Sequence, residues 1–173
     1  GLFTSILKQS GYVVDLFDCT PYLATYETTQ EPLVVKQANS LMTARKFDPI
    51  AILGDPKVDL IGDYQKKLEE FQPHVVIVST LVEDTWPQAK DLLKVLTNFP
   101  DIKSIVGGVY TVMSPEDVIS HPDVQCIGDG EGEETIVEFC EAVRKGLDIT
   151  NIPGTRAKDS QGNIIRNPSR QLV

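Results

Sequence analysis

The sequence is poor in the residues that build disulfide frameworks and metal sites. It has 3 cysteines and 2 histidines among 173 residues. Cys19, Cys126 and Cys140 are far apart, so they form neither a paired disulfide set nor the C-x-x-C spacing of a zinc or redox site. We therefore expect a reducing, cytoplasmic setting. His74 and His121 have no catalytic or metal-binding context, and we assign no catalytic residue and no metal ligand.

Long apolar runs and basic runs are also absent. No stretch of about 18 apolar residues could span a membrane, and the N-terminus lacks the pattern of a signal peptide. The net charge is −9, from 16 Lys plus Arg against 25 Asp plus Glu, and a field of that sign repels nucleic acid and anionic lipid. With 41% apolar and 24% charged residues, the chain has the composition of an ordinary soluble domain.

Several motifs of nucleotide-binding and hydrolytic enzymes are missing. The sequence contains no G-x-G-x-x-G dinucleotide fingerprint, no Walker A pattern and no G-x-S-x-G nucleophile elbow. These absences disfavour a nicotinamide enzyme, a nucleoside triphosphatase and an α/β-hydrolase. Composition and motifs favour a binding module over an enzyme.

β-branched apolar runs alternate with segments of helical period, which favours a three-layer, Rossmann-like (flavodoxin-like) α/β fold with a parallel sheet and flanking helices. Ser114 before Pro115 is typical of a helix N-cap. The predicted strands are residues 12–17, 74–79, 103–106 and 124–127, and the predicted helices include 33–47, 64–71, 86–96 and 136–143.

Both ends of the sequence suggest a domain within a longer protein. The apolar face of residues 2–7 predicts a helix, so a first, central strand of the flavodoxin-like order is expected before Gly1, unless another chain or an unusual edge takes its place. Residues 154–166 predict a C-terminal β-hairpin with a turn at 159–163. We divide the chain into a Rossmann-like domain at 1–149 and a hairpin with linker at 150–173.

Ligands of open parallel sheets bind beyond the carboxyl ends of the strands. The loops there are residues 18–20, 79–81, 107–111 and 128–134, which gather glycines and hydroxyls. Each also has a structural interpretation. Ser79 and Thr80 could cap the following helix, Gly107 and Gly108 could be turn glycines, and residues 130–134 could be an acidic first turn that favours the helix dipole.

Taken together, these loops resemble a known family. Ser79-Thr80-Leu81 and Gly107-Gly108 resemble the S-x-L and G-G motifs of cobalamin-binding domains. With residues 109–116 and 127–135, the pattern is similar to the cobalamin-binding domain of cobalamin-dependent radical SAM proteins, which include methyltransferases and magnesium-protoporphyrin monomethyl ester cyclase. Residues 151–168 resemble the hairpin that leads into the radical SAM barrel of those proteins.

The resemblance implies a corrin ring over the carboxyl edge of the sheet and a nucleotide tail in a cleft beside it. Ser79 and Leu81 would contact the tail, Gly107 and Gly108 would give it clearance, and residues 130–133 would edge the cleft. The full set of implied cofactor-binding residues is Ser79, Thr80, Leu81, Gly107, Gly108, Val109, Tyr110, Gly128, Gly130, Glu131, Gly132 and Glu133.

Two family motifs are absent. Without D-x-H-x-x-G, cobalamin would be bound base-off and without a histidine ligand from this chain. Without C-x-x-x-C-x-x-C, the iron–sulfur cluster and S-adenosylmethionine would belong to a partner domain after Val173. The chain would position the corrinoid for methyl transfer or related radical chemistry and would not be catalytic alone.

The alternative is a flavodoxin-like or receiver-like interaction or signalling domain without corrinoid. A receiver needs a phosphoacceptor aspartate after its third strand, where this sequence has Ser79-Thr80. A flavodoxin needs a phosphate loop that would fall before Gly1.

Overall fold

The computed structural model describes residues 1–22, 55, 57–81 and 83–170. The chain forms two compact units, Gly1–Asp15 with Gln72–Val173, and Leu16–Phe71. The helix predicted at 33–47 lies outside the described residues.

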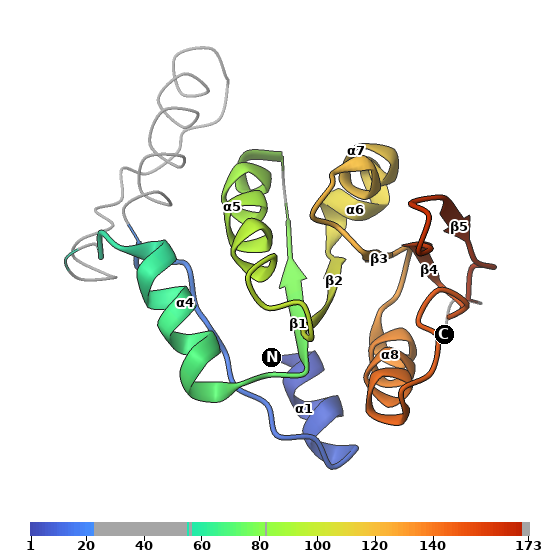
Figure 1. Cartoon of the computed structure of the whole chain (residues 1–173), viewed down its shortest axis with the longest axis horizontal. Helices are drawn as coiled ribbons and strands as arrows, with labels where there is room; N and C mark the ends of the chain where they lie inside the picture. Colours follow the sequence, from blue (N-terminus) through green and yellow to red (C-terminus); the bar gives the residue numbers. More distant parts are fainter. Residues whose placement is uncertain (23–54, 56, 82, 171–173) are drawn as a thin grey trace, which may run out of the picture. The chain divides into compact units, whose positions relative to one another are not determined.

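The first unit is built on a five-stranded sheet of order β1-β2-β3-β4-β5 (Figure 1). The first three strands are parallel, β4 is antiparallel to β3, and β5 is antiparallel to β4. The predicted α/β fold with flanking helices is confirmed, and the predicted hairpin extends the same sheet. The strands are β1 (Val75–Ser79), β2 (Lys103–Gly107), β3 (Cys126–Gly128), β4 (Thr155–Lys158) and β5 (Ile164–Arg166).

The β-branched runs form the strands because both faces of a parallel sheet are covered and favour residues such as valine and isoleucine. The ladder between β1 and β2 runs from Val75 opposite Lys103 to Ser79 opposite Gly107. The strand predicted at 124–127 begins two residues later, at Cys126.

The prediction of a strand at residues 12–17 is wrong. These residues form no strand, and among the described residues no ladder pairs with this segment. Tyr12 and Val14 pack against the core while Val13 is 86% exposed, so the alternating pattern is real. Alternation selects a face, but a strand also needs a neighbour that accepts its backbone hydrogen bonds.

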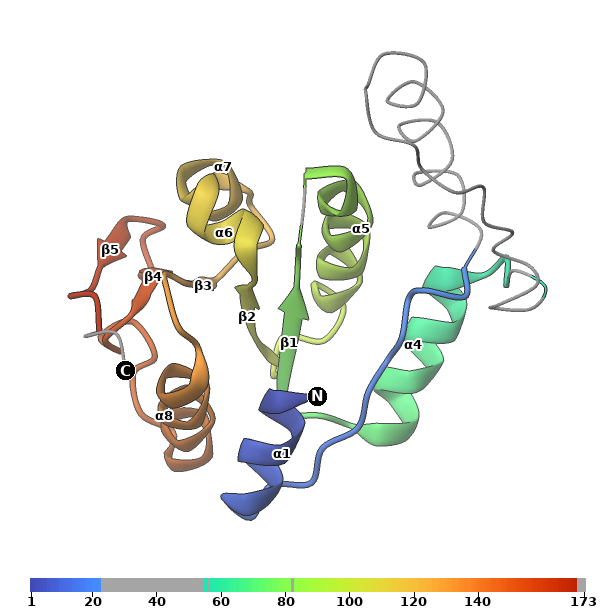
Figure 2. The same cartoon turned by 180° about the vertical axis from the view of Figure 1, so that it is seen from behind.

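The described part of the first unit has six helical segments, of which α1, α5 and α8 carry the predicted apolar stripes. The six segments are α1 (Leu2–Gln9), η1 (Glu83–Thr85), α5 (Trp86–Leu96), α6 (Val109–Met113), α7 (Pro115–Ser120) and α8 (Glu133–Lys145). Ser114 precedes α7 as predicted, but its side chain makes no capping hydrogen bond. Figures 1 and 2 show α1 and α8 side by side, with α5, α6 and α7 away from them.

One core cluster lies between the sheet and the pair α1 and α8. Phe139 of α8 is fully buried in this cluster, and a side chain buried this way contributes about 1.5–3 kcal/mol. The cluster consists of Leu7, Ile105, Cys126, Ile136, Phe139, Cys140, Ala142, Ile152 and Ala157. It fixes α8, and therefore the loop that leads into α8, against the sheet.

The second unit contains α4 (Leu60–Phe71), which includes the predicted helix 64–71. Its buried Tyr64 ring lies 5.1 Å from the Phe17 ring. The Tyr22 hydroxyl donates to Asp63 at 2.9 Å, and Tyr22 forms an isolated parallel bridge with Lys57.

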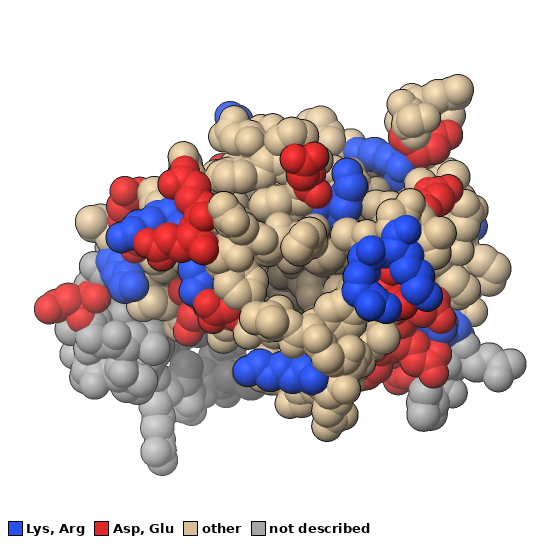
Figure 3. All heavy atoms as spheres, turned by 60° about the horizontal axis from the view of Figure 1, so that its bottom comes forward, with Lys and Arg blue, Asp and Glu red and all other residues tan. Residues whose placement is uncertain are grey.

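On the face drawn in Figure 3, basic side chains lie beside acidic ones rather than in separate patches. Within the described parts of the chain, no helix is both long and apolar enough to cross a bilayer.

One cluster of charges ties the segment after α1 to α8. Glu141 accepts hydrogen bonds from the Tyr12 hydroxyl at 2.9 Å and from Arg144 at 2.8 and 2.6 Å, and it pairs with Lys145 at 2.9 Å. The hydrogen bonds from Arg144, Lys145 and Tyr12 lower the pKa of Glu141 from 4.5 to about 2. The ionised carboxylate is therefore favoured in the folded state.

We expect Glu141→Gln to reduce the pH dependence of stability in acid. A carboxyl whose pKa is lowered in the folded state stabilises the fold at pH values above its ordinary pKa of 4.5. This contribution is lost as the pH falls towards about 2. Urea midpoints measured at about pH 6 and about pH 3 should differ less in the variant than in the parent. The exposed Asp101→Asn serves as control, and an unchanged difference in the Glu141 variant would contradict the assignment.

Candidate functional site

Three parallel strands deliver three loops to one edge of the sheet. We call these loops the rim: residues 79–81 after β1, 107–111 after β2, and 128–133 after β3. Ser79 lies opposite Gly107 at the end of the β1–β2 ladder, and Val106 lies opposite Ile127 in the next pair. The sequence-predicted site residues of these loops are therefore brought together at the carboxyl edge, where α/β proteins bind ligands.

The first and second rim loops interlock through their backbones. The Thr80 N–H donates to the Gly107 carbonyl at 2.8 Å, and the Tyr110 N–H donates to the Thr80 carbonyl at 3.3 Å. Thr80 is 1% exposed and its hydroxyl lies 3.4 Å from the Gly107 oxygen. Its side chain therefore serves the loop contact and does not cap the following helix, whose N-cap is Thr85.

Gly108 is required by the chain itself. Its φ is +106°, and a Cβ at this position would lie 2.1 Å from the Thr80 carbonyl oxygen. A side chain is excluded by both the backbone conformation and the contact. The interpretation of Gly108 as a structural glycine is therefore supported.

Gly107 is different. A Cβ built there would meet no atom of the described residues within 4 Å, and its φ lies outside the positive range. Glycine weakens a strand relative to residues with side chains, so this position leaves open space at a cost. That is the arrangement expected where a ligand approaches the backbone.

The third rim loop combines open and packed glycines. Gly130 has φ +131°, and a Cβ there would meet no described atom within 4 Å, whereas a Cβ at Gly132 would lie 2.6 Å from the Phe3 ring of α1. Gly132 is thus a packing glycine and the N-cap of α8, and Glu133 and Glu134 lie in the first turn of that helix. The acidic-turn interpretation holds for these two glutamates, while Gly130 and the exposed Glu131 lie before the helix.

Apolar side chains lie exposed on the first two loops. Leu81 is 64% exposed and Val109 is 53% exposed. Tyr110 is half-buried and its hydroxyl donates to Asp117 at 2.8 Å, which helps to raise the pKa of Tyr110. Exposed apolar groups beside accessible backbone and hydroxyls suit a bulky, largely uncharged ligand.

Other candidates lie elsewhere. The loop 18–20 belongs to the second unit. His74 precedes β1, at the opposite end of that strand from the rim, and the His121 ring packs on Trp86 at 5.8 Å. Over the described ranges, no cluster of three or more His, Cys, Asp or Glu side chains is arranged to hold a metal ion.

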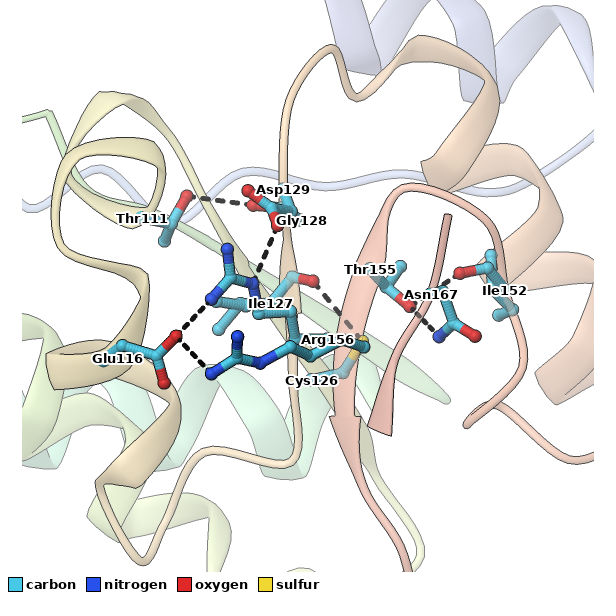
Figure 4. Close-up of polar contacts among 11 residues, drawn as sticks. Thr111, Glu116, Cys126, Ile127, Gly128, Asp129, Ile152, Thr155, Arg156 and Asn167 are labelled. Carbon is cyan, nitrogen blue, oxygen red and sulfur yellow. Dashed lines mark hydrogen bonds and ion pairs between the residues drawn. The ribbon is translucent and has the colours of Figure 1, made fainter. Parts of the chain in front are cut away.

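Two contacts of the third rim loop were not predicted from the sequence. The Thr111 hydroxyl lies 3.1 Å from the Gly128 carbonyl oxygen, and the Arg156 guanidinium lies 2.7 Å from the Asp129 carboxylate (Figure 4). Thr111 stood in the predicted loop 107–111, but its role depends on a contact 17 residues away. Arg156 lies 27 residues from Asp129 and carries no local signal.

Residues 19–140 match the family described as the B12 binding domain. The chain belongs to this family. The matched residues include all three rim loops. The match favours the cobalamin-binding hypothesis over the receiver-like or flavodoxin-like one.

Two curated relatives of this B12-binding domain are named as methyltransferases. The uncharacterized methyltransferase PH0819 of Pyrococcus horikoshii is 26% identical over 149 residues, which are 84% of this chain and 32% of the relative. The cytidylyl-2-hydroxyethylphosphonate methyltransferase of Streptomyces wedmorensis is 24% identical over 112 residues, which are 64% of this chain and 21% of the relative. The chain thus spans a third or less of the relatives that it matches.

Two solved structures share the fold. The radical S-adenosylmethionine methyltransferase TsrM of Kitasatospora setae has a TM-score of 0.63 at 16% identity, over 96% of this chain and 26% of its own. The cobalamin-dependent S-adenosylmethionine radical enzyme OxsB, solved with aqua-cobalamin, has a TM-score of 0.54 at 23% identity, over 71% of this chain and 18% of its own. At these identities the likeness is one of fold.

We expect Gly108→Ala to destabilise the protein by about 2 kcal/mol or more, because alanine is strained at this φ and clashes with the Thr80 carbonyl. Gly107→Ala is the matched control on the adjacent residue and should change the free energy of unfolding by less than about 0.5 kcal/mol. Urea unfolding of both variants measures the difference. Equal losses would show that the two glycines are not distinguished in this way.

Proposed function

We propose that this B12-binding domain holds cobalamin against the rim. The observation that carries the proposal is the open space above Gly107, flanked by loops that are locked to each other. A large ligand needs backbone clearance and a rigid edge, and the rim offers both. The family membership supports the same ligand.

Each rim loop would contribute a different kind of contact. Ser79 and Leu81 at the first loop and Val109 at the second present a hydroxyl and apolar surface to the ligand, since all three are exposed. Gly107 and Gly130 provide close approach to the backbone. Thr80, Gly108 and Gly132 act indirectly, because they fix the loops rather than face open space.

When bound, cobalamin supplies a cobalt centre that can carry and donate a methyl group. This chain would bind and orient the cofactor and exclude water from one side of it. We propose that the cobalt receives no histidine from the chain and that the cofactor is bound base-off. The positions of His74 and His121 support this, since one lies at the far end of β1 and the other packs on Trp86.

We propose that the domain acts within a radical SAM enzyme, where the iron–sulfur cluster and S-adenosylmethionine belong to a separate partner domain. Both curated relatives are named methyltransferases, so methyl transfer is a better-supported parent reaction than ring closure. We also propose a reducing, cytoplasmic setting. Cys126 and Cys140 support it, because both are buried free thiols.

We expect Gly107→Val to weaken cobalamin binding by at least about tenfold while the fold is retained, because the side chain fills the open space and valine suits a strand. Lys103→Val is the matched control at the opposite end of β2. Titration with hydroxocobalamin, followed by absorbance after gel filtration, gives both affinities. The proposed function fails if the parent protein retains no corrinoid, or if the two variants bind equally.

We expect the double variant His74→Ala/His121→Ala to bind hydroxocobalamin with an unchanged visible spectrum. After reduction to cob(II)alamin, electron paramagnetic resonance should show no nitrogen splitting in either protein, since no histidine of the chain would ligate cobalt. A nitrogen splitting that disappears in the double variant would overturn the absence of a histidine ligand.

A further inference from the structure

The third rim loop is anchored to α6, which belongs to the second rim loop, and to β4 of the hairpin. At its first residue, the Gly128 carbonyl faces the Thr111 hydroxyl of α6 (Figure 4). At its second residue, the Asp129 N–H donates to the Gly154 carbonyl at 2.8 Å, and the Asp129 carboxylate binds Arg156 of β4. Gly130, which follows, lies in open space.

Thr111 joins the second loop to the third. It is fully buried, and its hydroxyl lies 2.7 Å from the Gly108 carbonyl oxygen and 3.1 Å from the Gly128 carbonyl oxygen. The Gly108 carbonyl also receives the backbone N–H of Thr111 at 3.2 Å. The hydroxyl therefore lies within hydrogen-bonding distance of a carbonyl from each of the two loops and links them.

Arg156 holds the same loop from the hairpin. Its side chain is 16% exposed, and it donates to Asp129 at 2.7 Å and to Glu116 of α7 at 2.5 Å. Its position on β4, directly opposite Ile127, brings the guanidinium beside the loop. Arg166 of β5 reaches Glu116 at 2.9 Å and is 65% exposed, and its ion pair within the described residues is with Glu116 rather than Asp129.

We infer that Thr111 and Arg156 are positioning residues of the cobalamin site, an inference that rests on the proposed function. Thr111 fixes the carbonyl of Gly128, and Arg156 holds the Asp129 carboxylate towards β4 and balances its charge. Together they set where Gly130 lies, and therefore the shape of the third side of the rim. The hairpin thus contributes to the site as well as to the sheet.

The test compares two matched pairs of variants in the purified protein. Thr111→Val removes the hydroxyl and keeps the shape, whereas Thr111→Ser keeps the hydroxyl. Arg156→Met removes contacts with both Asp129 and Glu116. Arg166→Met is its control, because within the described residues the ion pair of Arg166 is with Glu116 and not with Asp129. Hydroxocobalamin titration measures the affinity, and urea unfolding verifies that each variant is folded.

We expect hydroxocobalamin to bind about five- to tenfold more weakly to Thr111→Val and Arg156→Met, with parental affinity in Thr111→Ser and Arg166→Met. Hydrogen–deuterium exchange without ligand should be faster at residues 128–131 in the first two variants alone. A merely structural role would instead spread faster exchange over the core strands.

Each outcome has one meaning. If the parent protein binds the corrinoid and Thr111→Val and Arg156→Met bind it like their controls, the positioning role is overturned. If the parent protein binds no corrinoid, the proposed function fails, and the exchange data decide the anchoring separately. Unchanged exchange at residues 128–131 in both variants overturns the anchoring, and faster exchange confined to them supports it.

Discussion

The contact between Gly108 and the Thr80 carbonyl is the constraint on which the rest of the site depends. It brings the turn after β2 against the end of β1 so closely that no side chain fits between them. Once this contact is made, the Thr80 and Tyr110 amides find their acceptors, and α6 begins in the direction that satisfies them. The direction of α6 in turn places the Thr111 hydroxyl beside the Gly128 carbonyl. The rim is therefore one connected structure, joined by backbone hydrogen bonds and by the Thr111 hydroxyl, rather than three independent loops.

Much of the fold follows from local pattern. β1, β2, α5 and α8 were predicted from β-branched runs and apolar stripes, and the hairpin from its turn. The segment 12–17 failed because alternation reports which side chains are buried and says nothing of a hydrogen-bonding neighbour. The rim loops were predicted as places, but Gly108 and Gly132 owe their identity to Thr80 and Phe3, which lie far away in sequence. Thr111 and Arg156 likewise act on the third loop through partners that lie far away in sequence.

Acidic side chains in the third rim loop and in the first turn of α8 are paired with arginines in the folded chain. Asp129 is paired with Arg156, and Glu134 is paired with Arg170 at 2.8 Å. Arg170 also binds Glu138 and, at 3.0 Å, the Thr135 hydroxyl. The C-terminal segment thus supplies the cations that balance the first turn of α8 and the loop before it. The net charge of −9 overstates the negative field that a ligand at this edge would meet.

The two adjacent rim glycines would have opposite histories under selection. Gly108 is maintained by folding alone, so it would persist in any descendant that keeps the fold. Gly107 weakens its strand, and a Cβ there would meet no described atom within 4 Å, so only a bound ligand would disfavour a side chain at this position. A lineage that no longer used its ligand would be expected to replace Gly107 early, because many side chains there would be tolerated. The residue found at position 107 in related chains would therefore indicate whether each of them still binds a ligand at this edge of the sheet.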